Sequence, residues 1–329
     1  MTRLRIIVMG TGPFAVPMFR ALVASPHAIV AVVTRPDHAP PGRRPPPNPM
    51  REAANAAGIG ILAPERVNDP AVVSALAALR PDLFVVCDYG QILSRDLLAV
   101  PPLGGINLHG SLLPRHRGAA PVQWAIRAGD RLSGVSVIHM TPALDAGNVI
   151  VARDVTVAPR ETAAELEPRL AELGAGAVLD AVGRLQAALA AVGTVAGIGT
   201  PQDAALATRA PRLAKQDGIV DWTQAASSIE RLRRALEPWP RLSTFVVRGD
   251  GQRHRLVLED VEVATHPAAA AAAPGTVLDA SDGRLVVACG AGTALAVTRL
   301  IPEGRRGMSA ADYLRGSPLL PGAVLGDGR

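Results

Sequence analysis

The sequence predicts an α/β domain with a mostly parallel sheet, followed by a small β-barrel domain. In the first half of the chain, short apolar runs alternate with stretches of helical spacing, a pattern typical of an open parallel sheet covered by helices. Residues 191–211 are small and polar without clear periodicity, and they predict a linker. Beyond them lie five short strand-like runs with turn signals, as in a small barrel. A chain of 329 residues is long enough for two separate cores.

The first domain, predicted over residues 1–190, begins with a strand that a glycine turn joins to a helix. The apolar run Leu4–Met9 is followed by Gly10-Thr11-Gly12-Pro13, and a proline is tolerated in a first helical turn. The last helix begins at a capping box, Thr162-x-x-Glu165. Further strands are predicted over residues 28–34, 83–87, 104–108, 133–140 and 149–157. Helices are predicted over residues 13–24, 50–57, 70–79, 120–128 and 162–190.

The second domain is predicted over residues 212–329 and contains one helix before its strands. The helix is expected over residues 225–236 and carries three arginines. The strands are expected over residues 243–247, 254–263, 276–278, 285–288 and 294–300. The tail from Pro318 onward is rich in glycine and proline, and we expect it to be loosely held.

Composition favours a cytoplasmic protein without a membrane span or a metal site. No apolar run approaches the roughly 20 residues that a transmembrane helix needs. The apolar run near the N-terminus is too short for a signal peptide. Cys87 and Cys289 belong to no ligand-spaced pair, so we expect buried core residues rather than a disulfide or zinc site.

Positive charge is concentrated in one segment of the second half. The chain has a net charge of +5, and residues 209–256 hold ten basic against five acidic side chains. Such a stripe is the footprint of a polyanionic partner, nucleic acid before all others, or simply a solvated basic face. Lys215 is the single lysine in the chain, which indicates either a specific role or chance.

Three polar side chains indicate acyl-transfer chemistry. Asn107 and His109 are two residues apart on a predicted strand, so their side chains leave the same face. Asp145 follows in a Leu-Asp-Ala-Gly turn. An amide can steady an oxyanion, an imidazole can handle charge or protons, and a carboxylate can orient the imidazole or accept a proton.

The glycine turn at Gly10–Pro13 resembles a dinucleotide-binding fingerprint at a strand-to-helix junction. A nicotinamide cofactor site usually adds an acid at the end of the second strand, but this strand ends Val33-Thr34-Arg35-Pro36. We therefore favour a tight turn that packs near the site over cofactor binding.

The motif Asn107-x-His109-Gly-Ser-Leu-Leu-Pro-x-x-Arg117-Gly, with Asp145 downstream, resembles the folate-dependent formyltransferases. Its continuation is similar to the methionyl-tRNA formyltransferases in particular. The resemblance covers nearly the whole chain and is specific. It includes Gly118-Ala119-Ala120-Pro121, Ala214-Lys215-x-x-x-Ile219-Val220-Asp221-Trp222, Pro238-Trp239-Pro240, Pro274-Gly275-Thr276 and the run 302–310.

This resemblance implies a Rossmann-like domain that holds 10-formyltetrahydrofolate and an OB-like barrel that grips tRNA. It implies transfer of the formyl group to the α-amino group of methionine on initiator Met-tRNA, by a monomer and without a metal. The catalytic set would be Asn107, a protonated His109, and Asp145. The folate would contact Ser111, Leu112, Leu113 and Pro114, with Tyr89, Gly90 and Ile92 walling its pterin ring. The tRNA would contact Arg43 and Arg44 in the loop 35–49, and Lys215 and Arg233 in the second domain.

The chain departs from the family pattern in three places, and two alternative functions stay open. Arg44 and prolines replace the usual lysines of the basic loop, Asp88 replaces an alanine, and His116 replaces an aromatic residue. One alternative is a formyltransferase acting on an amino sugar nucleotide, against which the run Gly118–Pro121 and the basic segment argue. The other is an inactive tRNA-binding module, against which the intact triplet argues.

Overall fold

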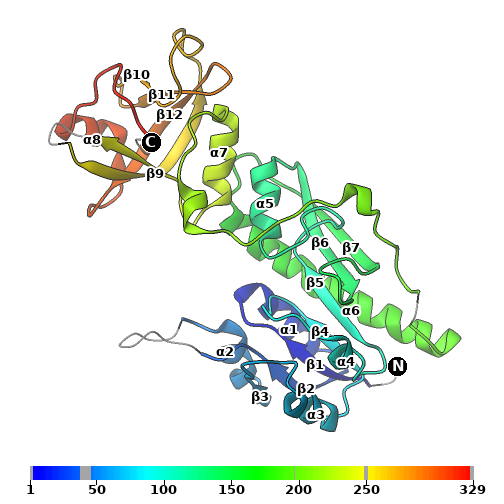
Figure 1. Cartoon of the computed structure of the whole chain (residues 1–329). Coiled ribbons are helices and arrows are strands. Elements are labelled where there is room, and N and C mark those ends of the chain that lie inside the picture. Colours follow the sequence, from blue (N-terminus) through cyan, green and yellow to red (C-terminus); the bar gives the residue numbers. More distant parts are fainter. Residues whose placement is uncertain (1–2, 38–45, 196, 248–250, 327–329) are drawn as a thin grey trace. The chain divides into compact units, whose positions relative to one another are not determined.

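The computed structural model describes residues 3–37, 46–195, 197–247 and 251–326 (Figure 1). It consists of two compact units. Unit 1 comprises residues 1–122, 131–157 and 166–211, and unit 2 comprises residues 123–130, 158–165 and 212–329. Two short segments from the first half of the chain thus belong to unit 2. The sequence predicts a first domain over residues 1–190, a linker over 191–211 and a second domain over 212–329, each as one continuous segment.

Unit 1 is built on a seven-stranded sheet in the order β3-β2-β1-β4-β5-β6-β7. The first five strands of that order run parallel, and β6 and β7 are antiparallel additions at one edge. The prediction of a mostly parallel sheet is confirmed. The strands are β1 (Arg5–Met9), β2 (Ala28–Val33), β3 (Ile61–Leu62), β4 (Leu83–Val86), β5 (Gly105–His109), β6 (Leu132–His139) and β7 (Val149–Thr156).

Continuous apolar runs form the central strands because helices cover both faces of a parallel sheet. All four residues of β4 are buried, as are Ile6–Met9 of β1. One apolar cluster on this sheet joins Met9, Phe84, Val86 and Tyr89. Cys87 is buried in the same strand region, as expected. The helices are α1 (Val16–Val23), α2 (Pro49–Ala56), α3 (Pro70–Ala78), α4 (Arg95–Leu98), α5 (Pro121–Ala128) and α6 (Ala163–Val192).

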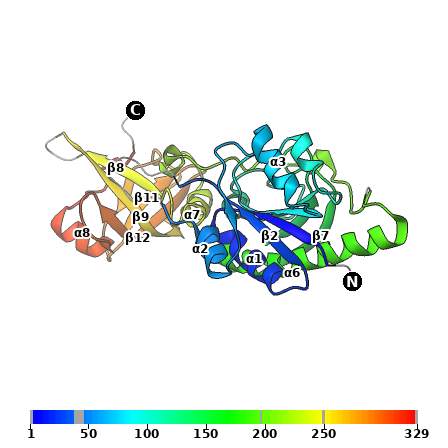
Figure 2. The ribbon, with the colours of Figure 1, turned by 90° about the horizontal axis from the view of Figure 1, so that it is seen from below.

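Helix α6 runs along the sheet of unit 1 (Figure 2). A Cβ on Gly174 would come within 2.7 Å of the Leu108 side chain, so an alanine at this position would require that side chain to shift. The predicted capping box is confirmed. The Thr162 N–H donates to Glu165 Oε2 at 2.9 Å, and the Glu165 N–H donates to Thr162 Oγ1 at 3.3 Å.

By length and composition alone, α6 is long and apolar enough to cross a membrane. Its leucines, however, are used inside the protein: Leu166, Leu170 and Leu185 are fully buried. Arg184 of the same helix donates to the Ile150 carbonyl of β7 at 2.7 Å. These contacts are those of a helix packed on a sheet.

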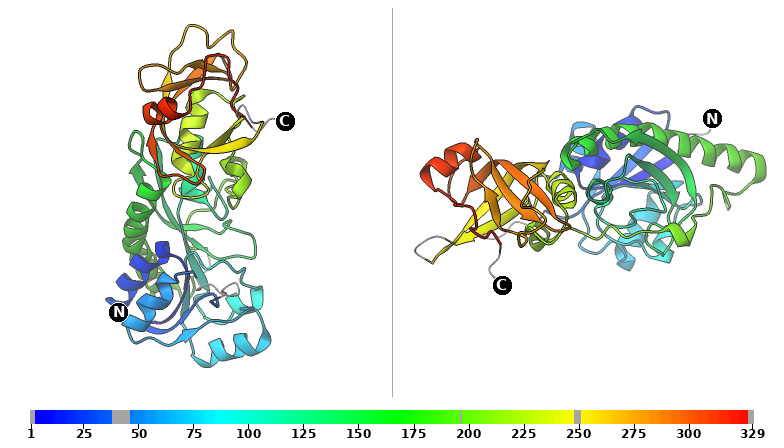
Figure 3. Two further views of the ribbon diagram at one scale, coloured as in Figure 1. Left: turned by 90° about the vertical axis from the view of Figure 1, so that its left-hand side faces the viewer. Right: turned by 90° about the horizontal axis from the view of Figure 1, so that it is seen from above.

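Unit 2 contains a six-stranded antiparallel sheet in the order β10-β11-β12-β9-β8, with β13 paired to β12. The curvature of this sheet is visible in Figure 3, with α8 in red at one end. Its core includes Trp222, Ile229, Leu258 and Val297, and the buried Cys289. The elements are α7 (Ala226–Ala235), β8 (Ser243–Val247), β9 (Arg253–Ala264), β10 (Val277–Asp279), β11 (Leu285–Cys289), β12 (Thr293–Pro302), β13 (Met308–Ser309) and α8 (Ala310–Gly316).

The chain end links the two edge strands of this sheet, so the expectation of a loosely held tail is wrong for residues 322–326. Val324 pairs with Thr276 just before β10, and Leu325 pairs with Val246 of β8. The Leu325 side chain is 2% exposed and lies in the core of unit 2. Pairing on both sides leaves neither edge open at this point, which is the geometry of a small closed barrel.

Candidate active site

The candidate site lies where parallel strands β1, β4 and β5 end. Val86 of β4 pairs with Asn107 of β5 and also with Met9 of β1. Two residues beyond that pair lie Asp88, in the bend after β4, and His109, the last residue of β5. The strand order changes direction between β1 and β4, and ligands of open α/β sheets bind outside the carboxyl ends of strands at such a point.

His109 is held by polar groups on both ring nitrogens. Its Nε2 atom lies 2.9 Å from the His116 carbonyl oxygen. Because a carbonyl can only accept, Nε2 carries the hydrogen and donates it. Its Nδ1 atom lies 3.7 Å from Asp145 Oδ2. The two side chains are 5% and 9% exposed, so little water screens this contact.

Burial lowers the pKa of His109 below its ordinary value of 6.5. The negative charge of Asp145 and the hydrogen bond to the His116 carbonyl both raise the pKa of His109, and the His116 ring lowers it further, but burial outweighs the raising effects. The lowered pKa favours the neutral imidazole near pH 7. The protonated His109 that the resemblance implies stays a prediction for the step in which negative charge develops on the formyl oxygen.

Asp145 sits at the tip of a loop in a left-handed backbone conformation, with φ of +50°. Its Oδ2 atom accepts a hydrogen bond of 2.8 Å from the Gly118 N–H. The Asp145 carboxylate therefore connects its loop to the motif that contains His109. The same hydrogen bond helps to hold the left-handed backbone of Asp145, a conformation that is uncommon outside glycine. Asn107 lies on β5, half-buried, on the same strand face as His109.

The Ser111–Pro114 segment is organised by its own hydrogen bonds. The buried Ser111 hydroxyl donates to the Arg115 carbonyl at 2.7 Å. Ser136 Oγ donates to the Ser111 carbonyl at 2.8 Å and accepts from the Leu113 N–H at 3.1 Å. Ser111 thus shapes the turn, and the half-buried Leu112, Leu113 and Pro114 side chains remain at its surface.

The Tyr89–Ile92 segment presents a different surface from the one its sequence suggests. The Tyr89 ring is buried in the apolar cluster with Val86 and Leu97, and burial raises the pKa of Tyr89 to about 12. Ile92 is 73% exposed, and Gly90 is exposed with φ of +81°. Within this segment, Gly90 and Ile92 are therefore the residues that a ligand can reach.

Asp88 lies against the glycine turn. Its carbonyl accepts from the Thr11 N–H at 3.1 Å, and a Cβ on Gly12 would lie 1.8 Å from Asp88 Oδ2. Burial raises the pKa of the Asp88 carboxyl, while the Gly12 N–H and Arg35 lower it. In a dinucleotide-binding site, a phosphate would lie against the backbone of this glycine turn. Here the Asp88 carboxylate lies at that position, so the geometry favours a tight packing turn over cofactor binding.

Sequence reasoning missed the contribution of the segment assigned as a linker. The Gln202 side chain bonds to Arg117 and to the Asp145 loop. Thr208 accepts from the backbone N–H groups of His116 and Arg117, at 2.8 Å each. The Ala210 N–H donates to the Arg117 carbonyl at 2.7 Å. Small polar residues without periodicity carry no signal for such contacts.

No group of three or more His, Cys, Asp or Glu side chains able to hold a metal ion occurs among the residues that the structure describes. The catalytic set expected from the sequence contains one imidazole, one amide and one carboxylate. Nitrogen and oxygen groups of this kind can carry out acyl transfer by proton movement and oxyanion stabilisation alone.

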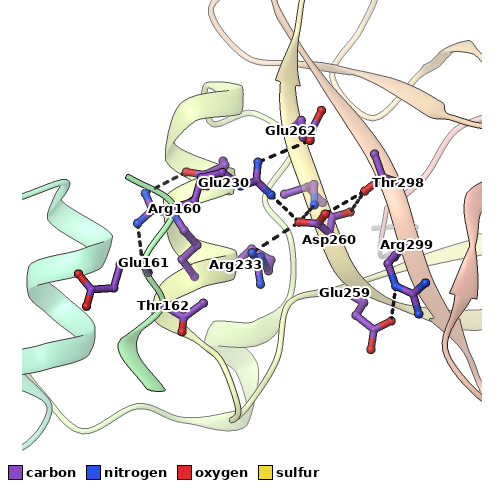
Figure 4. Close-up of polar contacts among 12 residues, drawn as sticks. Arg160, Glu161, Thr162, Glu230, Arg233, Glu259, Asp260, Glu262, Thr298 and Arg299 are labelled. Carbon is purple, nitrogen blue, oxygen red and sulfur yellow. Dashed lines mark hydrogen bonds and ion pairs between the residues drawn. The ribbon is translucent and has the colours of Figure 1, made fainter. Parts of the chain in front are cut away.

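Arginines of unit 2 form an ion-pair cluster around β9 (Figure 4). Arg160 lies 2.7 Å from Asp260 and 3.7 Å from Glu262. Arg233 on α7 lies 3.6 Å from the same Asp260 and is 12% exposed. Thr298 also donates to Asp260, at 3.2 Å. Part of the positive charge in the basic segment is therefore balanced within the unit.

The other predicted tRNA contacts have different surroundings. Lys215 is exposed in a short 3₁₀ helix, Lys215–Gly218. Arg43 and Arg44 lie outside the described residues. Arg212 and Arg253 of the basic segment are exposed as well.

Comparison with known proteins places the chain in a family. Residues 2–182 match the formyl transferase family model, and residues 212–318 match the model of the formyl transferase C-terminal domain. Methionyl-tRNA formyltransferase of Rhodopirellula baltica is 43% identical over 330 residues, which cover 98% of this chain and 96% of that protein. The chain belongs to the methionyl-tRNA formyltransferase family. Methionyl-tRNA formyltransferase of Desulfotalea psychrophila is 40% identical, covering 98% of this chain and 95% of the relative.

Solved structures share the fold of this methionyl-tRNA formyltransferase family member at low sequence identity. WlaRD, a sugar 3N-formyl transferase crystallised with dTDP and 5-N-formyl-THF, has a TM-score of 0.61 at 13% identity, covering 93% of this chain and all of that one. HypX from Aquifex aeolicus, in complex with tetrahydrofolic acid, has a TM-score of 0.57 at 18% identity, covering 95% of this chain and 47% of that one. At these identities the likeness establishes the fold alone.

Proposed function

We propose that the chain transfers the formyl group of 10-formyltetrahydrofolate to the α-amino group of methionine on initiator Met-tRNA. The observation that carries the proposal is the approach of Asp145 Oδ2, from the loop between β6 and β7, to within 3.7 Å of His109 Nδ1 at the end of β5. Relatives named methionyl-tRNA formyltransferase, similar over nearly the full chain, support a tRNA-linked methionine as the acceptor.

The chemistry follows from the protonation state of the site. The neutral α-amine attacks the formyl carbon, and negative charge develops on the formyl oxygen, where the Asn107 amide stabilises it. Asp145 accepts the proton that the amine loses and passes it to Nδ1 of His109. The resulting imidazolium adds positive charge while the oxyanion is present. The carbon–N10 bond then breaks, and this proton returns through Asp145 to N10 of tetrahydrofolate, which takes it up in place of the formyl group.

The folate would lie along the Leu112–Pro114 turn, against Gly90 and the exposed Ile92. Exposed apolar groups beside polar backbone fit a flat bicyclic ring with hydrogen-bonding edges. Leu144, next to Asp145, is likewise exposed and offers apolar contact beside the carboxylate. The buried Tyr89 would support Gly90 and Ile92 from the core, and Ser111 would shape the turn.

For the tRNA, we propose contacts from Lys215 and from Arg43 and Arg44, with a formyltransferase domain over residues 1–190, a linker over 191–211 and a tRNA-binding domain over 212–329. Of the predicted contacts in unit 2, exposed Lys215 is better placed than Arg233, which is paired with Asp260. Arg233 stays a prediction. The chain would act as a monomer in the cytoplasm, where charged tRNA is used.

The test is incubation of the protein with 10-formyltetrahydrofolate labelled in the formyl group and either initiator Met-tRNA or a dTDP-linked amino sugar. We expect label on the tRNA, recovered as formyl-methionine after mild alkaline hydrolysis. Label on the nucleotide sugar alone would replace the proposed acceptor. Label on neither, with retained tRNA binding, would favour an inactive binding module.

A further inference from the structure

We propose that Gln202, in the segment that the sequence assigns to a linker, is a positioning residue that sets the Asp145 carboxylate against His109. The inference rests on the proposed function and deepens it. The Gln202 oxygen accepts two hydrogen bonds from Arg117, from Nε at 3.1 Å and from Nη2 at 2.7 Å. Its nitrogen donates to the Asp145 carbonyl at 2.8 Å and the Gly147 carbonyl at 2.7 Å.

These four contacts fix the orientation of the amide. A guanidinium only donates and a carbonyl only accepts, so the oxygen of Gln202 must face Arg117 and its nitrogen the loop. One side chain therefore joins the motif that carries His109 to the loop that carries Asp145. An amide is suited to this task because it is uncharged and carries its donor and its acceptor on two separate atoms.

The backbone on either side of Gln202 is anchored as well. Thr200 pairs with Val149 at the start of β7, through hydrogen bonds of 2.9 Å in both directions. Further along, Thr208 and Ala210 pair with the backbone of Arg117. The segment 200–210 is thus fixed at both ends to the two elements that Gln202 connects.

The Asp145 loop needs this support. Asp145 has φ of +50°, a left-handed conformation that is uncommon outside glycine although aspartate tolerates it better than most residues. Its Oδ2 atom makes a single hydrogen bond of 2.8 Å with Gly118, and the loop carbonyls at positions 145 and 147 depend on the Gln202 amide. Without these donors, the carboxylate would no longer be held 3.7 Å from His109 Nδ1.

Two substitutions at Gln202 remove different sets of these contacts. Gln202→Glu keeps oxygens for Arg117 but cannot donate to the loop carbonyls, whereas Gln202→Leu loses both sets of contacts. We expect both variants to lower kcat roughly tenfold or more, with KM for Met-tRNA changed less than about twofold, because misplaced reacting groups cost rate rather than affinity. The matched control is the same pair of substitutions at Gln224, an exposed glutamine of unit 2.

A second readout is independent of catalysis. Asp145 raises the pKa of His109, so moving the carboxylate away should lower that pKa further in both Gln202 variants. The His109 titration, followed by NMR of the ring carbons, measures this directly. Normal kcat and an unchanged His109 pKa in Gln202→Glu would overturn the proposal. If the wild-type protein formylates no tRNA, the proposed function fails, while the His109 titration still decides whether Gln202 positions Asp145.

Discussion

A single carboxylate oxygen of Asp145 approaches both His109 and Gly118. Oδ2 accepts the Gly118 N–H at 2.8 Å and lies 3.7 Å from His109 Nδ1. The shorter contact fixes the position of the oxygen, and the longer one leaves room for a proton or a small shift during the reaction. Because the His109 and Asp145 side chains are nearly buried, little water screens the carboxylate charge that acts on the imidazole.

Removing the imidazole should disable the transfer step. We expect His109→Ala to lower kcat by about 10²-fold or more, because the intermediate loses a stabilising charge and a proton-handling group. The measurement is steady-state formylation of Met-tRNA. Asp145→Asn should have a comparable effect, and folate binding, measured separately, should change little in either. A His109→Ala enzyme with a rate near wild type would exclude this residue from the mechanism.

The titration of His109 offers a test that needs no substrate. Its pKa is lowered by burial, so NMR should show the ring becoming protonated only below pH 6.5. In Asp145→Asn the pKa should fall further, since the charge that raises it is gone. The unfolded chain binds this proton near 6.5 and the folded chain does so at lower pH. Stability from this group is therefore complete above pH 6.5 and is lost as pH falls from 6.5 through the folded pKa. A folded pKa above 6.5 would contradict the neutral resting state.

Gly118 should not tolerate a side chain. At φ of +131°, a Cβ would lie 2.4 Å from the backbone oxygen of Ala210, which cannot move aside as a flexible side chain could. We expect Gly118→Ala to displace the 200–210 segment or the Asp145 contact and to lower kcat about tenfold or more. Gly104→Ala is the control, because that glycine also has a positive φ but no atom within 4 Å of the added carbon. Equal activity losses in both variants would point to backbone strain alone.

The longer helices and strands could be predicted from the sequence because each shows its own spacing of apolar residues. Apolar runs such as Leu83–Val86 and the leucine spacing of α6 carry their structure locally, and so does the Thr162–Glu165 capping box. The short elements β3 and β13 have two residues each, too few to show any period. Helix α8 could have been found from its cap, since the Asp312 N–H donates to Ser309 Oγ.

The site was only partly predictable for a different reason. Asn107 and His109 are neighbours on one strand, and a motif reveals them. Gln202 lies 57 residues from Asp145, and nothing in its local sequence records that contact. The burial of the His109 side chain is the other quantity that the sequence does not show. The sequence shows a histidine, but the direction of its pKa shift follows from burial.

Salt dependence of tRNA binding distinguishes contacting basic residues from paired ones. Each lost phosphate contact should reduce the slope of log Kobs against log salt by about 0.7 to 0.9. We expect this reduction for Lys215→Gln, which is exposed, and a smaller one for Arg233→Gln, whose charge is already balanced by Asp260. Binding would be measured with catalytically impaired His109→Ala so that the tRNA stays unmodified. An unchanged slope for Lys215→Gln would assign the lysine to a solvated face.

The chain end should contribute substantially to the stability of unit 2. Leu325 is 2% exposed and closes the barrel, so Leu325→Ala should cost about 2–5 kcal/mol of unfolding free energy. The three tryptophans at positions 124, 222 and 239 all belong to unit 2, so their fluorescence during urea unfolding reports on this unit. Leu320 is 73% exposed in the same tail, and Leu320→Ala should cost less than about 0.5 kcal/mol. Equal, small losses in both variants would mean that residues 322–326 rest on the barrel without completing it.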